Sequence, residues 1–234
     1  MSSAPSPEFD AFARDYDAQL NQGLRLTGES KEYFARERIA FTRSLIAGAW
    51  PGNTRVADFG CGTGTAAPFL QEIFQPEVLA GCDPSHESVT EARKLHADSA
   101  AQFGNFEEVR NWGPFDLTYC NGVFHHILPD DRSAALRQVA ELCRPGGWFA
   151  LWENNPWNPM TRLIMSRVAF DRDAVLLTPA ETRRLLRAAG FSIVCTRYLF
   201  IFPTALKSLR FIEPWVSGLP TGGQYVVLAR RDGV

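Results

Sequence analysis

The order of hydrophobic and polar positions along the chain follows two alternating periods. Short, nearly continuous apolar runs have the length of buried strands and occur at 55–59, 78–82, 115–120 and 148–152. Between these runs, apolar residues recur every three or four positions, as on amphipathic helices, over 66–74, 85–97 and 131–143. The pattern therefore predicts repeated β-α-β units.

The ends of the chain extend this pattern. We expect helices over 9–20 and 30–49, a short strand at 101–103, a helix at 178–189 ended by Gly190, and final strands over 191–202 and 224–229. Repeated β-α-β units predict a Rossmann-like α/β fold, in which a doubly wound, mostly parallel sheet carries helices on both faces. Ligands of such sheets bind at the carboxyl ends of the strands, so the chemistry is expected in the loops that follow them.

The loop after the first predicted strand is rich in glycine. Gly60, Gly62 and Gly64 alternate with other residues directly before a helix. Glycine permits positive φ and lets a ligand approach the backbone, and the first turn of the helix offers free N–H groups to an anionic group. Thr65 stands where a dinucleotide fingerprint requires its third glycine, which argues against a nicotinamide dehydrogenase. Asp83 ends the second predicted strand, where it can accept hydrogen bonds from ribose hydroxyls.

Composition and charge exclude several classes of protein. The 234 residues are 45% hydrophobic with a net charge of −2, and they contain no lysine–arginine cluster of the kind that binds nucleic acid. The five cysteines are scattered without a C-x-x-C pair, so we expect a reducing compartment and no metal. No apolar stretch reaches the roughly 20 residues that span a bilayer, and the first seven residues lack the features of a signal peptide. We therefore expect a cytoplasmic protein with no nucleic-acid and no membrane partner.

Four segments together resemble the class I S-adenosylmethionine-dependent methyltransferases, in particular their small-molecule, type 11/12-like branch. The stretch VADFGCGTG at 56–64 is similar to their motif I, and GCDPS at 81–85 to their motif II. Residues 115–127 resemble the fourth-strand motif, and 142–148 resemble the turn before strand five. The four segments occur in the family's order, which makes the resemblance more specific than any one motif.

The resemblance implies a domain organisation and a set of cofactor contacts. It implies a seven-stranded sheet with a reversed final hairpin, a helical lid at 1–50, and a methyltransferase domain at 51–234 with a substrate-side excursion at 154–177. It also implies that the cofactor is S-adenosylmethionine. The implied contacts are Asp58, Gly60, Cys61 and Gly62 for the methionine part, Asp83 and Pro84 for the ribose, Asn105 and Phe106 for the adenine, and Asn121 and Gly122 for the sulfonium.

Two adjacent histidines, His125 and His126, follow the fourth predicted strand. An imidazole can take a proton at neutral pH, so one of them, with His126 preferred, is a candidate general base. Some relatives in the family pair such a histidine with an N-terminal tyrosine, for which Tyr16 and Tyr33 are the candidates here. The alternative is that both histidines only cap the end of the strand.

The stretch ENNPWNP at 153–159 interrupts the fifth strand with prolines and turn-forming asparagines. Because this strand end lies beside the fourth, the stretch is expected to face the acceptor. Trp157 would offer an aromatic surface, and Glu153 and Asn154 would offer polar atoms. The alternative is a rigid turn in which Glu153 bonds to neighbouring backbone.

The sequence thus predicts an enzyme that transfers a methyl group from S-adenosylmethionine to a hydroxyl or amine of a small-molecule acceptor, as a monomer or homodimer. An RNA or protein methyltransferase is disfavoured by the lack of a basic cluster. A regulatory or scaffold protein that binds the cofactor without catalysis remains the alternative of a different class.

Overall fold

The computed structural model describes residues 28–46, 48, 50, 54–167 and 174–233. The predicted helix over 9–20 and the candidate residue Tyr16 lie outside the described residues. Among the described residues, no helix has both the length and the apolar character needed to cross a membrane.

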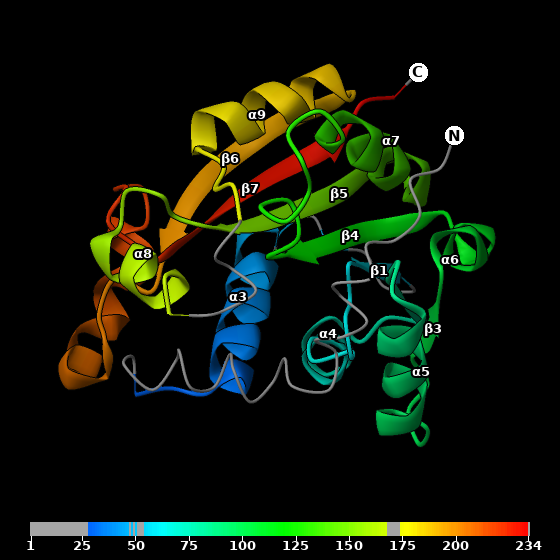
Figure 1. Ribbon diagram of the computed structural model, residues 1–234, viewed down its shortest axis with the longest axis horizontal. Coiled ribbons are helices and arrows are strands. Elements are labelled where there is room, and N and C mark those ends of the chain that lie inside the picture. The colour runs from blue at the N-terminus through cyan, green and yellow to red at the C-terminus, as the bar shows by residue number, and fades with distance from the viewer. Residues whose placement is uncertain (1–27, 47, 49, 51–53, 168–173, 234) are drawn as a thin grey trace.

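One seven-stranded sheet forms the centre of the molecule, with the strands in the order β3-β2-β1-β4-β5-β7-β6 (Figure 1). The strands are β1 Arg55–Phe59, β2 Val78–Cys82, β3 Gln102–Gly104, β4 Phe115–Asn121, β5 Cys143–Asn154, β6 Phe191–Leu199 and β7 Gln224–Arg231. Strands β1 to β5 pair in parallel, whereas β7 runs antiparallel to both β5 and β6. The predicted fold class and its reversed final hairpin are confirmed.

Helices cover both faces of this sheet, and each face has its own hydrophobic core. On one face, α6 Phe106–Trp112, α7 Arg132–Leu142 and α9 Pro179–Ala188 pack against the strands. On the other, the strands are covered by α3 Lys31–Leu45, α4 Ala67–Phe74 and α5 His86–Leu95 (Figure 1). Because the central strands are buried on both sides, their sequences are continuously apolar rather than alternating, as expected for a parallel sheet.

The order of the strands reverses between β1 and β4, which defines the ligand-binding edge. The chain leaves β1 toward β2 on one side and later enters β4 on the other, so the loops after β1 and β4 diverge. Such a switch point leaves a crevice at the carboxyl ends of the strands. The glycine loop follows β1, and the two histidines follow β4, so both lie at this crevice.

The structure adds short elements that the sequence pattern did not predict. They are α6, α8 Pro159–Met165, the 3-10 segment η3 Thr204–Ile212, and α10 Glu213–Val216. Strand β6 also ends at Leu199, three residues earlier than expected. Phe200 takes a left-handed conformation with φ of 64°, and the amides of Phe200 and Phe202 bond to the buried carboxylate of Glu213. This side chain from a later segment, which local sequence cannot reveal, ends the strand.

Candidate functional site

The glycine loop is shaped by two glycines with different surroundings. Gly60 has φ of 74°, and a Cβ at that position would lie 2.3 Å from the Cγ2 atom of Val123 in the loop after β4. Gly62 has φ of 53°, but a Cβ there would meet no atom within 4 Å. Gly60 therefore lets the two loops of the crevice touch, while Gly62 borders open space. A backbone that is bare on its open side fits the close approach of a ligand.

Asp83 joins the end of β2 to this loop. One carboxylate oxygen accepts the N–H of Gly62 at 2.9 Å, and the other accepts the N–H of Ser85 at 2.9 Å. These two bonds hold the carboxylate against the glycine loop. The side chain is half-buried at the edge of the crevice. These features fit its predicted contact with a ribose diol.

Asp58 lies beneath the loop and is 5% exposed. Burial, together with the negative charge of Asp83, raises its pKa to about 7, and the positive charge of Arg38 opposes the shift. An ammonium group placed beside Asp58 would favour the ionised carboxylate for the same Coulombic reason. The position therefore fits the predicted role near the methionine part of the cofactor.

Arg38 is a site residue that the sequence reading missed. It projects from α3, is 8% exposed, and donates from Nη1 to Oε1 of Gln224 at 2.8 Å. Its Nε atom has no hydrogen-bond acceptor among the described residues. A buried guanidinium with an unused donor beside Asp58 could hold a carboxylate of the ligand. The sequence did contain a signal for Arg38, because this charged residue shares the buried side of α3 with Ala35 and Ile39.

The predicted adenine contacts have a local structural role. Asn105 caps α6: its Oδ1 accepts the N–H of Glu108 at 3.0 Å, and Oε2 of Glu108 accepts the N–H of Asn105 at 2.8 Å. Phe106 packs against the core beneath that helix. A contact of Asn105 or Phe106 with adenine stays a prediction. Among the other predicted cofactor neighbours, Cys61 is buried, which raises its thiol pKa, and Pro84 is exposed. At the end of β4, Oδ1 of Asn121 is buried without a hydrogen-bond partner among the described residues, and Gly122 has φ of 69°.

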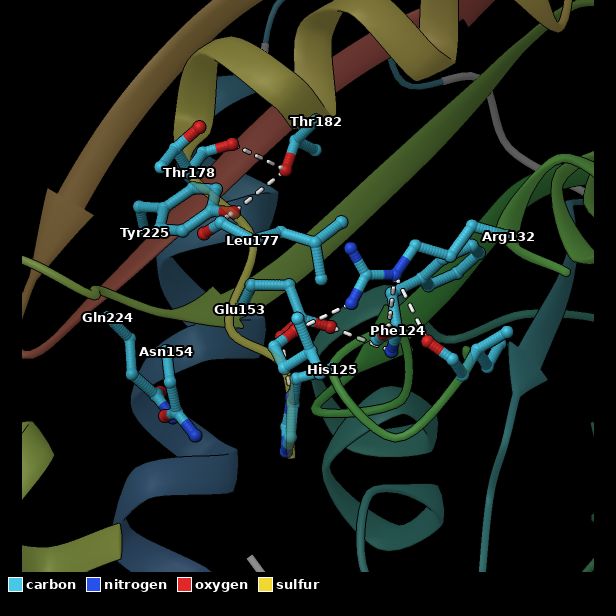
Figure 2. Close-up of polar contacts among 12 residues, drawn as sticks. Phe124, His125, Arg132, Glu153, Asn154, Leu177, Thr178, Thr182, Gln224 and Tyr225 are labelled. Carbon is cyan, nitrogen blue, oxygen red and sulfur yellow. Dashed lines mark hydrogen bonds and ion pairs between the residues drawn. The ribbon is translucent and has the colours of Figure 1, made fainter. Parts of the chain in front are cut away.

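The two histidines differ in their surroundings. His125 is 4% exposed, and its Nδ1 lies 2.6 Å from Oε2 of Glu153 (Figure 2). The other carboxylate oxygen of Glu153 accepts the N–H of Phe124 at 2.8 Å. His126 is half-buried, and its ring centroid lies 4.1 Å from that of His125. The histidine pair is thus fixed by a carboxylate from the neighbouring strand end.

Arg132 of α7 holds the backbone of the histidine loop from the opposite side. This fully buried guanidinium donates from Nε to the carbonyls of Phe124 at 3.2 Å and Ile127 at 3.1 Å (Figure 2). It also donates from Nη2 to the carbonyl of Val175 at 2.6 Å, and Val175 in turn donates its N–H to the carbonyl of His125 at 2.9 Å. The loop is therefore held at several backbone atoms, which keeps the histidines in register with Glu153.

The side chains of the stretch 153–159 differ in their exposure to solvent. Glu153 is fully buried with both oxygens engaged, so we revise its expected role from direct acceptor contact to support of His125. Oδ1 of Asn154 accepts a hydrogen bond from Nε2 of Gln224 at 3.0 Å, and Oε1 of the same glutamine accepts one from Arg38 of α3. Trp157 is 54% exposed. Its contact with an acceptor stays a prediction, as does that of Asn154.

Tyr33 lies farther along the same edge of the sheet. It lines a pocket of about 120 Å³ between α3 and the connection from β6 to β7, together with Glu37, Phe41 and Phe200. The guanidinium of Arg210 sits 4.9 Å from the centre of the Tyr33 ring, and burial raises the pKa of the phenol to about 12. The Tyr33 side chain is therefore a neutral hydroxyl at physiological pH. Its contact with an acceptor stays a prediction.

Known proteins share both the motifs and the architecture. A family model described as a methyltransferase domain matches residues 57–149. Trans-aconitate 2-methyltransferase of Mycolicibacterium gilvum is 32% identical over 149 residues, which cover 61% of this chain and 56% of that protein. The enzyme of the same name from Escherichia coli is 28% identical over 145 residues, with 60% and 56% covered. The chain thus spans about half the length of the curated relatives it matches.

Solved structures reproduce the fold over nearly the whole chain. An S-adenosylmethionine-dependent methyltransferase from Thermotoga maritima superposes with a TM-score of 0.62 at 17% identity, covering 96% of this chain and 98% of that one. Magnesium protoporphyrin IX methyltransferase from Synechocystis, solved with bound S-adenosylhomocysteine, gives a TM-score of 0.59 at 18% identity, with 90% and 86% covered. The family model, the curated relatives and the solved structures together support the resemblance to the class I S-adenosylmethionine-dependent methyltransferases seen in the four motifs, and the cofactor that it implies.

Proposed function

We propose that the chain transfers a methyl group to a hydroxyl or amine of a small-molecule acceptor, with the histidine pair handling the acceptor's proton. The observation that carries this proposal is the buried contact between His125 and Glu153, 2.6 Å long, at the ends of adjacent strands. Val123, two residues before His125, packs against Gly60, so the histidine loop touches the glycine loop directly. The proton acceptor and the cofactor loop therefore form one site.

The roles of the residues follow from their burial. Bound S-adenosylmethionine supplies an electrophilic methyl group, and the protein must align the acceptor with it. Because His126 is less buried than His125, His126 is placed to receive the proton that the acceptor hydroxyl or amine loses. His125 contacts the His126 ring and is itself held by Glu153, so both act as positioning residues.

The other candidate residues are proposed to bind either the cofactor or the acceptor. Gly62, Asp83, Asp58 and Arg38 are proposed to hold the cofactor, on the strength of the open backbone at Gly62, the hydrogen bond from Gly62 to Asp83, and the buried charges described above. Trp157, Asn154 and Tyr33 are proposed to contact the acceptor. Helix α3, which belongs to the lid predicted over 1–50, joins the two groups, because Arg38 lies near Asp58 while Tyr33 lines the pocket.

A labelled-methyl assay tests the proposal. Protein and methyl-labelled S-adenosylmethionine are incubated with a metabolite extract and with a panel of hydroxylated compounds, amines and trans-aconitate, the last because of the names of the matched relatives. We expect a labelled small molecule, and no labelled product from Asp83→Ala, whose cofactor affinity should fall by about 1.5–3 kcal/mol. Asp98→Ala, which changes an exposed aspartate in the turn after α5, is the control and should behave as the parent.

Two results would overturn the proposal. Tight binding of S-adenosylmethionine without any labelled product would favour the non-catalytic alternative. Labelling confined to RNA or protein in the extract would reject a small-molecule acceptor. Equal cofactor affinity of Asp83→Ala and the parent would remove Asp83 from the site.

A further inference from the structure

Exposed apolar side chains gather at one end of the molecule, in the two segments 157–167 and 203–219. Among the described residues, twelve large hydrophobic side chains are exposed. Eight of the twelve fall in these segments, as Trp157, Met160 and Leu163 near α8, and Leu206, Leu209, Phe211, Trp215 and Leu219 along η3 and α10. Trp215 is 79% exposed and Phe211 is 68% exposed, with their rings in edge-to-face contact. Clusters of this kind on a folded protein usually mark a binding surface.

Hydrogen bonds join the two segments into one face. Asn158 donates to the carbonyl of Thr221 at 2.9 Å, and the hydroxyl of Thr161 donates to the carbonyl of Gly223 at 2.8 Å. Asn155 donates to the carbonyl of Gly222 at 2.7 Å. Figure 1 shows α8 and the segment 204–219 together at the end of the molecule where β6 ends and β7 begins. We call the surface formed by 157–167 and 203–219 the apolar–basic face.

The exposed charges on this face are all positive. Arg162, Arg167 and Lys207 are exposed there. Glu213, the only acidic residue in the two segments, is 5% exposed, and its carboxylate accepts the amides of Phe200 and Phe202. The whole chain nevertheless carries a net charge of −2. The face therefore combines aromatic and aliphatic side chains with positive charge, on a protein that is otherwise slightly acidic.

We propose that the apolar–basic face docks the protein on an anionic lipid surface. Tryptophan, phenylalanine and leucine enter the interfacial region of a bilayer, while arginine and lysine interact with anionic headgroups. Such peripheral binding requires no membrane-spanning helix, so it replaces the sequence-based expectation that the protein has no membrane partner. The proposal is independent of the proposed function, because no residue assigned to the chemistry except Trp157 belongs to the face.

Charge also argues against a second copy of the chain as the occupant. In a two-fold symmetric dimer the same patch meets itself. The exposed cations Arg162, Arg167 and Lys207 would then approach their own copies, with no exposed acid on the face to offset the repulsion. An anionic bilayer satisfies both the apolar and the cationic parts of the face.

Vesicle cosedimentation of the full chain tests the proposal. We expect binding to vesicles of phosphatidylcholine and phosphatidylglycerol, weaker binding to phosphatidylcholine alone, and loss of binding at high salt. The double variant Phe211→Ser with Trp215→Ser should bind the anionic vesicles on the order of tenfold more weakly or worse. Lys207→Gln should weaken binding by about fivefold.

Leu219→Ser and Leu95→Ser form a matched pair, because the two leucines are 55% and 60% exposed but only Leu219 lies on the face. Leu219→Ser should weaken vesicle binding, and Leu95→Ser should not. Unchanged melting curves and S-adenosylhomocysteine affinity show that each variant is folded. Absence of parent binding to anionic vesicles, or equal binding by the double variant, would overturn the proposal. So would a concentration-dependent dimer, seen by light scattering without lipid, that the double variant abolishes.

Discussion

Glu153 and His125 meet across the ends of β5 and β4, with the carboxylate Oε2 2.6 Å from the imidazole Nδ1 and both side chains buried. One residue was expected to line an acceptor wall and the other to act as a base or a cap. Their contact makes them one unit, in which the carboxylate fixes the ring and also receives the N–H of Phe124. The following predictions test what that unit and its neighbours do.

Glu153→Ala should lower stability strongly, because it leaves both His125 and the amide of Phe124 without their buried partner. A buried hydrogen-bonding group that loses its partner costs about 1–3 kcal/mol, and two such groups are affected here. Denaturant unfolding measures the change. Glu153→Gln keeps the shape of the side chain and an acceptor for the N–H of Phe124, so this variant should still fold at low temperature. It should turn over more slowly than the parent, with a larger change in kcat than in acceptor KM. A Gln variant with normal kcat would leave Glu153 with a purely structural role.

His126→Ala should reduce turnover by roughly 10²–10⁴-fold if His126 receives the acceptor's proton. Affinity for S-adenosylhomocysteine, measured by calorimetry, should remain unchanged, since His126 belongs to the loop after β4 and not to the glycine loop. His86→Ala, an exposed histidine on α5, serves as the control and should turn over normally. Full activity of His126→Ala on an identified acceptor would instead support the interpretation that the histidines cap β4.

Asp58 should make both stability and cofactor binding depend on pH. Its folded-state pKa is about 7, above the ordinary value of 3.8, so the folded state holds the proton more tightly than the unfolded chain. The resulting contribution to stability is complete below about pH 4 and is lost as the pH rises to about 7. Without cofactor, Asp58→Asn should therefore gain stability relative to the parent across this window.

Binding of the cofactor should shift Asp58 from the protonated to the ionised form. An ammonium group beside the carboxylate favours ionisation, so the parent's affinity for S-adenosylhomocysteine should rise as the pH approaches about 7, and Asp58→Asn should lose this rise. Calorimetric titrations at several pH values measure both proteins under the same conditions. Parallel pH profiles for the variant and the parent would separate Asp58 from the ligand's ammonium group.

Trp157→Ala should weaken acceptor binding without destabilising the fold. The side chain is 54% exposed, so its removal leaves no cavity in the core. An aromatic contact contributes roughly 0.5–1.5 kcal/mol beyond the burial of its surface, so acceptor KM should rise by about tenfold or more. Cofactor affinity should be unchanged. A lower melting temperature with an unaltered KM would assign Trp157 to the turn instead of the acceptor.

Much of the architecture was determined by the sequence because it depends on local patterns. The boundaries of β1 and β2 match the apolar runs, since buried parallel strands are short and continuously hydrophobic. Ser30 and Thr178 cap α3 and α9 as expected from residues that accept the first free N–H groups of a helix. The glycine loop and Asp83 were recognisable because the backbone requirements of a ligand-binding turn restrict the residues that can stand there.

Tertiary structure decided the features that depend on partners distant in the chain. Glu153 receives its role from His125, 28 positions away, and Arg38 receives its role from Asp58 and Gln224. No local pattern distinguishes a carboxylate that will be buried beside an imidazole from one that faces an acceptor, because both follow the same apolar strand. The apolar–basic face is likewise not apparent in the sequence, where its two segments are separated by α9 and β6. Only the packing of α8 against the turn at 220–223 brings their exposed side chains to one end of the molecule.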